Sequence, residues 1–352
     1  MSAGVEPGAL APRALLARPR ALAASLRAEL FAGVFCLLVL LVIPPIANAF
    51  WLKACIAAVI AAISAGGGGL LYGRVGMVSL CQMSLVGVGG WICLRLGLGT
   101  SLPFPVLLVI SGAVTALVGV FVGIPALRMT GLYFALVTLM AAGAFEVVFQ
   151  TTGFPNGGAG PLGLISGFQA RATMRRPAMA HSDAAFFRYA VVVAAIVFLL
   201  ALLHLRTRPG RAWTAIRQSE AAALSCGVNV TLYRLWAFAL ASFGSGIAGA
   251  LYVASVGSLD WGTVSARQSI VLFAAILMGG AYSLLGAVLA GALLELMPAL
   301  FDTLNLSGNV VLILFGIGIV QVLATAPAGM AGQMKDGAMA LRALALRKAA
   351  RA

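Results

Sequence analysis

The chain has very little charge. Only 9% of its 352 residues are Asp, Glu, Lys or Arg, whereas soluble domains carry roughly a quarter. Hydrophobic residues make up 62% of the sequence, so a water-soluble fold could not cover its surface with polar groups. This composition excludes a soluble enzyme, a disordered chain and a disulfide scaffold. It predicts an all-α protein, a polytopic transmembrane helical bundle.

Residues that support catalysis or metal binding are also scarce. The two histidines, His181 and His204, lie outside the centres of the apolar runs and have no metal-type spacing. The five cysteines form no CxxC pair, which argues against a disulfide framework and a zinc site. No Gly-Lys pair exists, so the chain has no P-loop. We therefore expect no catalytic residue, no metal and no cofactor, and any ATP would be hydrolysed on another chain.

Acidic residues number only nine, and two of them lie well inside apolar runs. Intramembrane acids are costly and often functional. For Glu146 the sequence leaves open a pathway or hydrogen-bonding role and a position near the membrane boundary. For Glu295 it favours packing or a helix-end contact over a substrate role. Two isolated acids do not form the charge relay that an ion-driven transporter needs.

The basic residues outnumber the acidic ones and give a net charge of +14. They form no face interleaved with stacking aromatic side chains, so we expect no nucleic acid partner. They cluster between apolar runs, as the positive-inside rule describes. With the N-terminus in the cytoplasm, 16 of the 23 basic residues fall on the cytoplasmic side. Both termini are therefore predicted to be cytoplasmic.

Apolar runs divide the chain into a basic cytoplasmic tail (1–30), a transmembrane domain (31–326) and a second basic cytoplasmic tail (327–352). Eight to ten spans are expected, because two of the ten runs are short. Their approximate limits are 31–43, 53–72, 75–94, 104–125, 131–150, 188–205, 235–255, 268–282, 285–301 and 308–326. A polar loop at 151–187 is predicted to be external.

Two glycine and alanine patterns leave alternatives open. Residues 46–49, Ile-Ala-Asn-Ala, resemble a signal-peptidase site after the first run, but a retained span is favoured because the next run starts at once. Gly66 to Gly69 are four consecutive glycines, which indicate either a helix break or a very close contact. Small residues four apart, such as Ser245 and Gly249, predict close helix packing.

Residues 206–234 form a basic cytoplasmic segment that is too polar to span a membrane. Residues 211–226 favour one helix, and Gly227 can stop it. Arg217 and Glu220 are three residues apart and can pair on that helix. A small apolar stripe is expected from Ala212, Ile216, Ala223 and Cys226. Such an amphipathic helix can lie on the membrane or dock into a groove on a partner.

Several blocks in this sequence resemble a known family. Glu220-Ala221-Ala222 followed by Gly227 resembles the EAA loop of ABC importer permeases, with four intervening residues where three are usual. The wider pattern from Gly210 to Asn229 resembles LivM-type permeases of branched-chain amino-acid importers. Further matching blocks are Arg128 to Leu139, Pro155 to Gly163, Gly246 to Tyr252 and Gly279 to Ala292. Ser79-Leu80-Cys81-Gln82 departs from the family, which usually has glycine at the third position.

The resemblance implies a non-catalytic permease subunit of an ATP-driven importer in a bacterial inner membrane. Its implied partners are a second related permease, two cytoplasmic ATP-binding subunits, an extracytoplasmic substrate-binding protein and membrane lipid. ATPase coupling is assigned to Arg211, Arg217, Glu220, Ala221, Ala222 and Gly227. The translocation path is assigned to Ser79, Gln82, Tyr133, Thr138, Glu146 and Asn156.

Other functions stay open at this point. The substrate is expected to be a branched-chain or related amino acid, with urea, amides and aromatic acids as alternatives. An ion-coupled secondary transporter would need no ATPase and would stop when the ion gradient collapses. A membrane-embedded enzyme would need a nucleophile beside a base, which the positions of the two histidines do not favour.

Overall fold

The structure is a computed structural model in which part of the chain is described. The described residues are 43–127, 129, 131–151, 173–174, 176–177, 180–305, 308–325 and 329–334. The chain falls into two units, 1–47 and 48–352, and the helices below all belong to the second. Throughout the described residues the regular elements are helices, which confirms the all-α class. The expected first span at 31–43 lies outside the described residues except for Ile43.

Six helices in the described part of the chain are long and apolar enough to cross a membrane. They are α2 (Ala49–Leu70, continued by the π-helix η1, Leu71–Val75), α4 (Phe104–Ala126), α5 (Leu132–Thr151), α6 (Asp183–Arg206), α9 (Val230–Val256) and α11 (Leu284–Thr303). Three shorter helices occupy other expected spans: α3 (Gln82–Gly99), α10 (Ala266–Gly279) and α12 (Gly308–Thr325). Among the described residues, nine of the ten expected runs are therefore helical, and six of these helices meet the spanning criterion.

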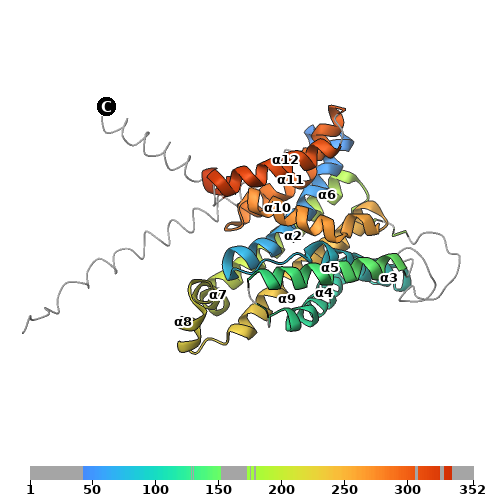
Figure 1. Cartoon of the computed structure of the whole chain (residues 1–352). Helices are drawn as coiled ribbons and strands as arrows, with labels where there is room; N and C mark the ends of the chain where they lie inside the picture. Colours follow the sequence, from blue (N-terminus) through green and yellow to red (C-terminus); the bar gives the residue numbers. More distant parts are fainter. Residues whose placement is uncertain are drawn as a thin grey trace, which may run out of the picture. The chain divides into compact units, whose positions relative to one another are not determined.

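Helix α9 is the central element of this unit and packs against α2, α3 and α4, while α11 packs against α2 (Figure 1). Small residues allow the closest contacts. A Cβ at Gly249 would overlap the carbonyl oxygen of Val86, and Gly89 faces the backbone of Gly246. The spacing of Ser245 and Gly249 therefore marks a real packing face, as the sequence predicts.

The four glycines do not break α2, because the helix continues through them to Leu70. They make close contacts instead: a Cβ at Gly67 would lie 2.9 Å from the carbonyl oxygen of Ala241 on α9. The interruption follows at η1, which ends at Gly76 in the left-handed conformation (φ 83°). Residues 76–81 have no regular structure, so the expected span at 75–94 begins only at Gln82. Apolar residues continue through this interruption, which is why hydropathy did not reveal it.

A second interruption separates α10 from α11. Gly280 has a φ of 109°, and Ser283 caps α11 by accepting a hydrogen bond from the amide of Gly286 at 3.1 Å. The two interruptions meet, because a Cβ at Gly73 in η1 would overlap the carbonyl oxygen of Ala281. Arg74 also donates from Nη2 to the carbonyl oxygen of Tyr282 at 3.2 Å.

The polar segment after α6 forms two helices, α7 (Arg208–Gln218) and α8 (Glu220–Ser225), rather than the single helix expected over 211–226. They lie near the beginning of α9 in Figure 1. Ser219 adopts an extended conformation between them and caps α8, because its hydroxyl accepts from the amide of Ala222 at 3.3 Å. A serine cap competes with helix continuation. Gly227, with a φ of 77°, ends α8 as predicted.

Candidate translocation path and coupling segment

A buried polar cluster joins four elements in the core. We define it as Ser64 on α2, Ser79 in the segment 76–81, Gln82 on α3 and Ser245 on α9. Ser245 donates to Oε1 of Gln82 at 2.6 Å, and Nε2 of Gln82 donates to the hydroxyl of Ser79 at 3.5 Å. The hydroxyls of Ser64 and Ser245 lie 3.4 Å apart. Uncharged donors and acceptors therefore converge on Gln82, which is only 2% exposed.

Side chains from other helices satisfy the backbone beside this cluster. The amide of Leu80 donates to Oγ1 of Thr138 on α5 at 3.1 Å, and the amide of Met83 donates to the hydroxyl of Ser269 on α10 at 3.2 Å. Irregular backbone at membrane depth needs such internal partners. Side-chain hydrogen bonds from α5 and α10 thus hold the end of the interruption and the start of α3.

The candidate coupling segment, α7 and α8, contacts the interruption directly. Arg217 on α7 donates from Nη1 to the carbonyl oxygen of Gly73 in η1. Its guanidinium carbon also lies 4.7 Å from the ring centroid of Tyr282, between α10 and α11. A cation over an aromatic face is attracted by the ring quadrupole. One arginine therefore connects α7 to both interruptions.

A second contact fixes α7 to α9. Trp213 is fully buried, and its Nε1 donates to the carbonyl oxygen of Tyr233 at 2.8 Å. The expected apolar stripe is confirmed at Ala212, Ile216 and Ala223, all of which are buried, but it is wrong at Cys226, which is exposed. Cys226 lies where the chain turns away after α8, so the helical spacing no longer applies.

The expected pair of Arg217 and Glu220 does not form. Glu220 instead accepts two hydrogen bonds from Arg234 on α9, at 3.2 and 2.7 Å. The break at Ser219 places Arg217 and Glu220 on different helices, so helical i to i+3 spacing does not bring them together. On α8, Ala221 and Ala222 are exposed, and Leu224 is 57% exposed. This short helix therefore presents a small, mostly apolar surface.

Comparison with known proteins assigns the family. The family model described as branched-chain amino acid transport system, permease component, matches residues 49–323. The chain belongs to this family. Together with the six long apolar helices, this makes it a multi-pass membrane protein, and we refer to it below as the permease.

Two curated relatives carry the name high-affinity branched-chain amino acid transport system permease protein LivM. The one from Salmonella typhimurium is 29% identical over 237 residues, covering 62% of this chain and 52% of the relative. The one from Escherichia coli is 28% identical over 259 residues, covering 65% and 60%. The permease thus spans between about half and three-fifths of the relatives it matches. No solved structure matches it.

The permease brings together three of the six residues assigned to a path: Ser79, Gln82 and Thr138. Tyr133 on α5 is 66% exposed, unlike the buried residues of the cluster. Glu146 accepts from the amide of Ala266 at 3.0 Å, so it caps the start of α10. Such a carboxylate at a helix N-terminus is favourable. Asn156 lies outside the described residues.

Two cluster members were missed as polar groups by sequence reasoning. Ser245 lies between two glycines and was assigned only to packing, and Ser64 precedes the four glycines by two positions. A serine beside glycines inside an apolar run is the signal that could have found them. Glu295 lies partly buried on α11, a helix that contributes no residue to the cluster. In the described residues no group of three or more His, Cys, Asp or Glu could hold a metal ion.

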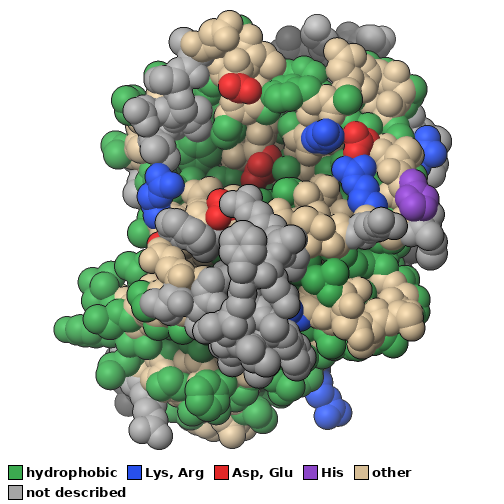
Figure 2. All heavy atoms as spheres, turned by 90° about the vertical axis from the view of Figure 1, so that its right-hand side faces the viewer, with side chains coloured by type: hydrophobic (Ala, Val, Ile, Leu, Met, Phe, Trp, Pro, Cys, Tyr) green, Lys and Arg blue, Asp and Glu red, His purple; other side chains and the backbone are tan. Residues whose placement is uncertain are grey.

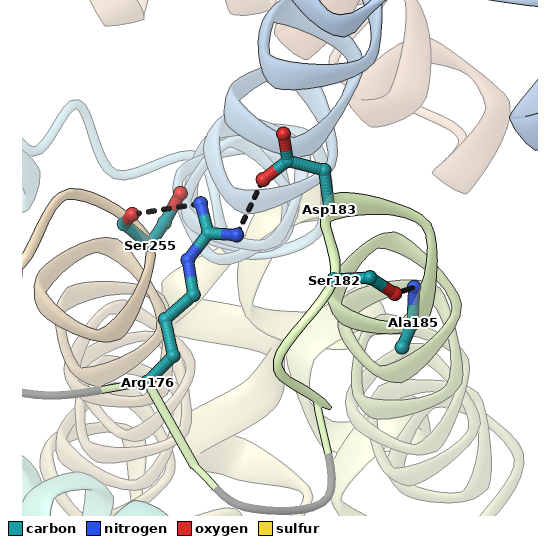
Figure 3. Close-up of polar contacts among 5 residues, drawn as sticks. All are labelled: Arg176, Ser182, Asp183, Ala185 and Ser255. Atoms are coloured by element: carbon teal, nitrogen blue, oxygen red, sulfur yellow. Dashed lines mark hydrogen bonds and ion pairs between the residues drawn. The ribbon is translucent and has the colours of Figure 1, made fainter.

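The other end of the permease carries its own polar contacts (Figure 3). Arg176 forms an ion pair with Asp183 at the start of α6 and donates to the carbonyl oxygen of Ser255 near the end of α9, at 3.3 Å. Its guanidinium carbon lies 5.6 Å from the ring centroid of Phe186. Ser182 caps α6 by accepting from the amide of Ala185 at 3.2 Å. The described part of the predicted external loop is therefore attached to two helix ends.

Figure 2 shows Lys, Arg, Asp, Glu and His side chains mainly in the upper half of one face, and hydrophobic side chains over much of the lower half. On α4 and α5, large apolar side chains are strongly exposed, including Phe121 at 79% and Met140 at 76%. Surfaces of this kind suit contact with lipid or with another membrane helix.

Proposed function

We propose that the permease is a membrane-spanning subunit of an ATP-driven ABC importer in a bacterial inner membrane, with both termini in the cytoplasm. It would carry branched-chain or related amino acids. Its partners would be a second related permease, two ATP-binding subunits and an extracytoplasmic substrate-binding protein. The observation that carries this proposal is family membership combined with a short exposed helix pair that contacts the interrupted core.

ATP hydrolysis belongs to the partner subunits in this proposal, because the sequence contains no Gly-Lys pair for a P-loop. The docking surface would be α8, where Ala221, Ala222 and Leu224 are exposed. Glu220 and Arg234 would hold α8 against α9 rather than contact the ATPase themselves. The Schellman turn at Gly227 would fix the angle at which α8 leaves the segment.

The translocation path would pass the polar cluster. Gln82, Ser79, Ser64 and Ser245 offer uncharged hydrogen-bonding groups that can replace water around the polar ends of an amino acid. They are buried here, so substrate passage would require these contacts to open. Alternating access supplies such an opening when the two states make different contacts with the ATPases.

Copurification of the permease with candidate ATPase subunits tests the docking surface. Ala221→Arg should remove the ATPase from the complex, because a long charged side chain replaces a methyl group on the exposed face of α8. Arg208→Ala, on the exposed start of α7, is the matched control and should copurify normally. Membrane insertion of both variants is measured in parallel. An Ala221→Arg complex as stable as the wild type would contradict the assignment of α8.

Uptake into vesicles containing the full complex tests the reaction and its substrate. We expect uptake of leucine, isoleucine or valine that requires ATP and the binding protein and persists when ion gradients are dissipated. Urea, amides and aromatic acids form the comparison panel. If the permease alone moved solute down an ion gradient, it would be a secondary transporter and the importer proposal would be wrong.

A further inference from the structure

We propose that Arg217 is the positioning residue that transmits movement of the coupling segment to the polar cluster through the π-helix Leu71–Val75. This inference rests on the proposed function, because it requires an ATPase that moves α7 and α8. It goes beyond docking, since it assigns the connection between the cytoplasmic segment and the buried hydrogen bonds of the core. Gln82 and Ser245 are the groups whose separation it would control.

Helix α7 contacts α9, which carries Ser245, and η1, which precedes the segment 76–81 that leads to Gln82 on α3. Through Arg217 it binds the carbonyl oxygen of Gly73 in η1, six residues before Ser79 in the chain. Through Trp213 it binds the carbonyl oxygen of Tyr233 on α9, the helix that carries Ser245. A rotation or shift of α7 would therefore act on the two sides of this bond through separate contacts.

Arg217 contacts η1 at a place where the backbone of η1 packs closely against another backbone segment. A Cβ at Gly73 would overlap the carbonyl of Ala281, so η1 lies directly against the turn between α10 and α11. Arg74 fixes the same turn through the carbonyl of Tyr282. The stem of Arg217 passes Gly76, where a Cβ would lie 3.8 Å from its Cγ. Single π-turns inside helices are frequent at functional sites.

Arginine is suited to this position for a geometric reason. Its planar guanidinium can stack on the Tyr282 ring while an N–H donates to the Gly73 carbonyl. Lysine carries the charge and can donate to one carbonyl, but it lacks the planar face. The two contacts together hold η1 and the turn between α10 and α11 at a fixed distance from α7.

The test measures the ratio of ATP hydrolysed to substrate transported, using the full complex in vesicles. For Arg217→Ala we expect normal assembly with the ATPases, continued ATP hydrolysis and a fall in transport of about tenfold, the size of one lost charge-assisted hydrogen bond. Arg217→Lys should recover part of the coupling. Arg208→Ala is the control on the same helix and should keep the wild-type ratio.

Substitutions at Tyr282, which Arg217 contacts, provide a second test of the same proposal. Tyr282→Phe keeps the aromatic face and should keep the wild-type ratio, whereas Tyr282→Leu should raise the ATP used per substrate in the same direction as Arg217→Ala. If Arg217 and Tyr282 had only a structural role, their variants would lower assembly, ATP hydrolysis and transport together. The amount of ATP hydrolysed per substrate transported would then stay at the wild-type value.

Each outcome decides between the proposals. If Arg217→Ala transports with the wild-type ratio, the positioning role is wrong. If Arg217→Ala loses the ATPases, Arg217 is a docking residue and the inference is overturned. If the wild-type complex shows no ATP-dependent uptake, the proposed function is wrong. The wild-type measurement alone shows this, without any Arg217 variant.

Discussion

The two interruptions of the helical core are closed in different ways. The interruption at residues 71–81 is held by side chains from elsewhere, because Thr138 accepts from the amide of Leu80 and Ser269 accepts from the amide of Met83, just after it on α3. The interruption between α10 and α11 is held by backbone fit. A Cβ at Gly279 or Gly286 would overlap the backbone of the other side of the turn. Apart from the close contact of Gly73 with Ala281, the first depends on side-chain hydrogen bonds, whereas the second depends on backbone contacts at glycines.

This difference separates a part of the core that can rearrange from a part that cannot. A hydroxyl can exchange one hydrogen-bond partner for another, or for a substrate, with little change in free energy. A glycine contact offers no such exchange, because close-packed backbone atoms have nowhere to move. We therefore expect movement during transport to concentrate at residues 71–82, with the turn between α10 and α11 as the fixed support.

The largest effect is expected from adding one methyl group to the fixed turn. Gly279→Ala should destabilise the permease by about 1–3 kcal/mol or prevent folding, because the new Cβ would overlap the carbonyl of Gly286. Thermal unfolding of the detergent-solubilised protein measures this. Gly143→Ala on α5 is the matched control, since no atom lies within 4 Å of a Cβ there. Equal unfolding temperatures for the two variants would contradict the backbone-fit interpretation.

The next effect is expected in the polar interruption and should fall on transport more than on folding. Gln82→Met keeps the volume of the side chain but removes the acceptor for Ser245. We expect destabilisation of about 1–3 kcal/mol from the unpaired buried hydroxyls and a loss of most uptake in vesicles.

The double variant Gln82→Met with Ser245→Ala sharpens this prediction. It should regain much of the lost stability, because it removes one of the hydroxyls left without its partner, while uptake stays low. Recovery of uptake together with stability would show that the Gln82–Ser245 bond serves packing only.

A smaller effect is expected at the cap of α8. Ser219→Ala removes the hydroxyl that accepts from the amide of Ala222 and should cost about 1 kcal/mol of local stability. Hydrogen exchange of the α8 amides should become faster, with the amides of α9 unchanged. Unchanged exchange in α8 would mean that its contacts with α7 and α9 hold it without the cap.

The smallest effect is expected from the ion pair on the coupling segment. Glu220→Gln should change stability by less than about 1 kcal/mol, because the Glu220 side chain is 44% exposed and solvent screens the pair. Measurement of the unfolding temperature at low and high salt checks this. A loss of several degrees at high salt would show a larger role for Glu220 than screening allows.

The sequence predicted the class of fold and the position of the polar segment between α6 and α9, because both depend on local composition. Runs of apolar residues mark α4, α5 and α9 within a few residues, and the polar stretch around Pro209 marks the segment between α6 and α9. The family assignment from scattered motifs is confirmed. The roles assigned to Arg217, Ala221 and Gln82 stay predictions.

Features that depend on contacts between distant residues could not be predicted from the sequence. The interruption at 76–81 is as apolar as the helices beside it, so only the conformation of Gly76 and its distant partners define it. Glu220 pairs with Arg234, fourteen residues away, because the break at Ser219 redirects α8. Tyr133 follows the family pattern in sequence, yet it lies on the exposed side of α5.

The π-helix η1 also sets the rotation of α2 relative to the segment that follows it. A π-turn holds one more residue than the α-turn it replaces, and each residue of an α-helix corresponds to a rotation of about 100°. Deletion of one residue within Leu71–Val75 would therefore turn Gly67 on α2 away from Ala241, or else pull Ser79 away from Gln82. The number of residues in this one turn decides whether the Gly67–Ala241 contact and the Ser79–Gln82 hydrogen bond can form at the same time.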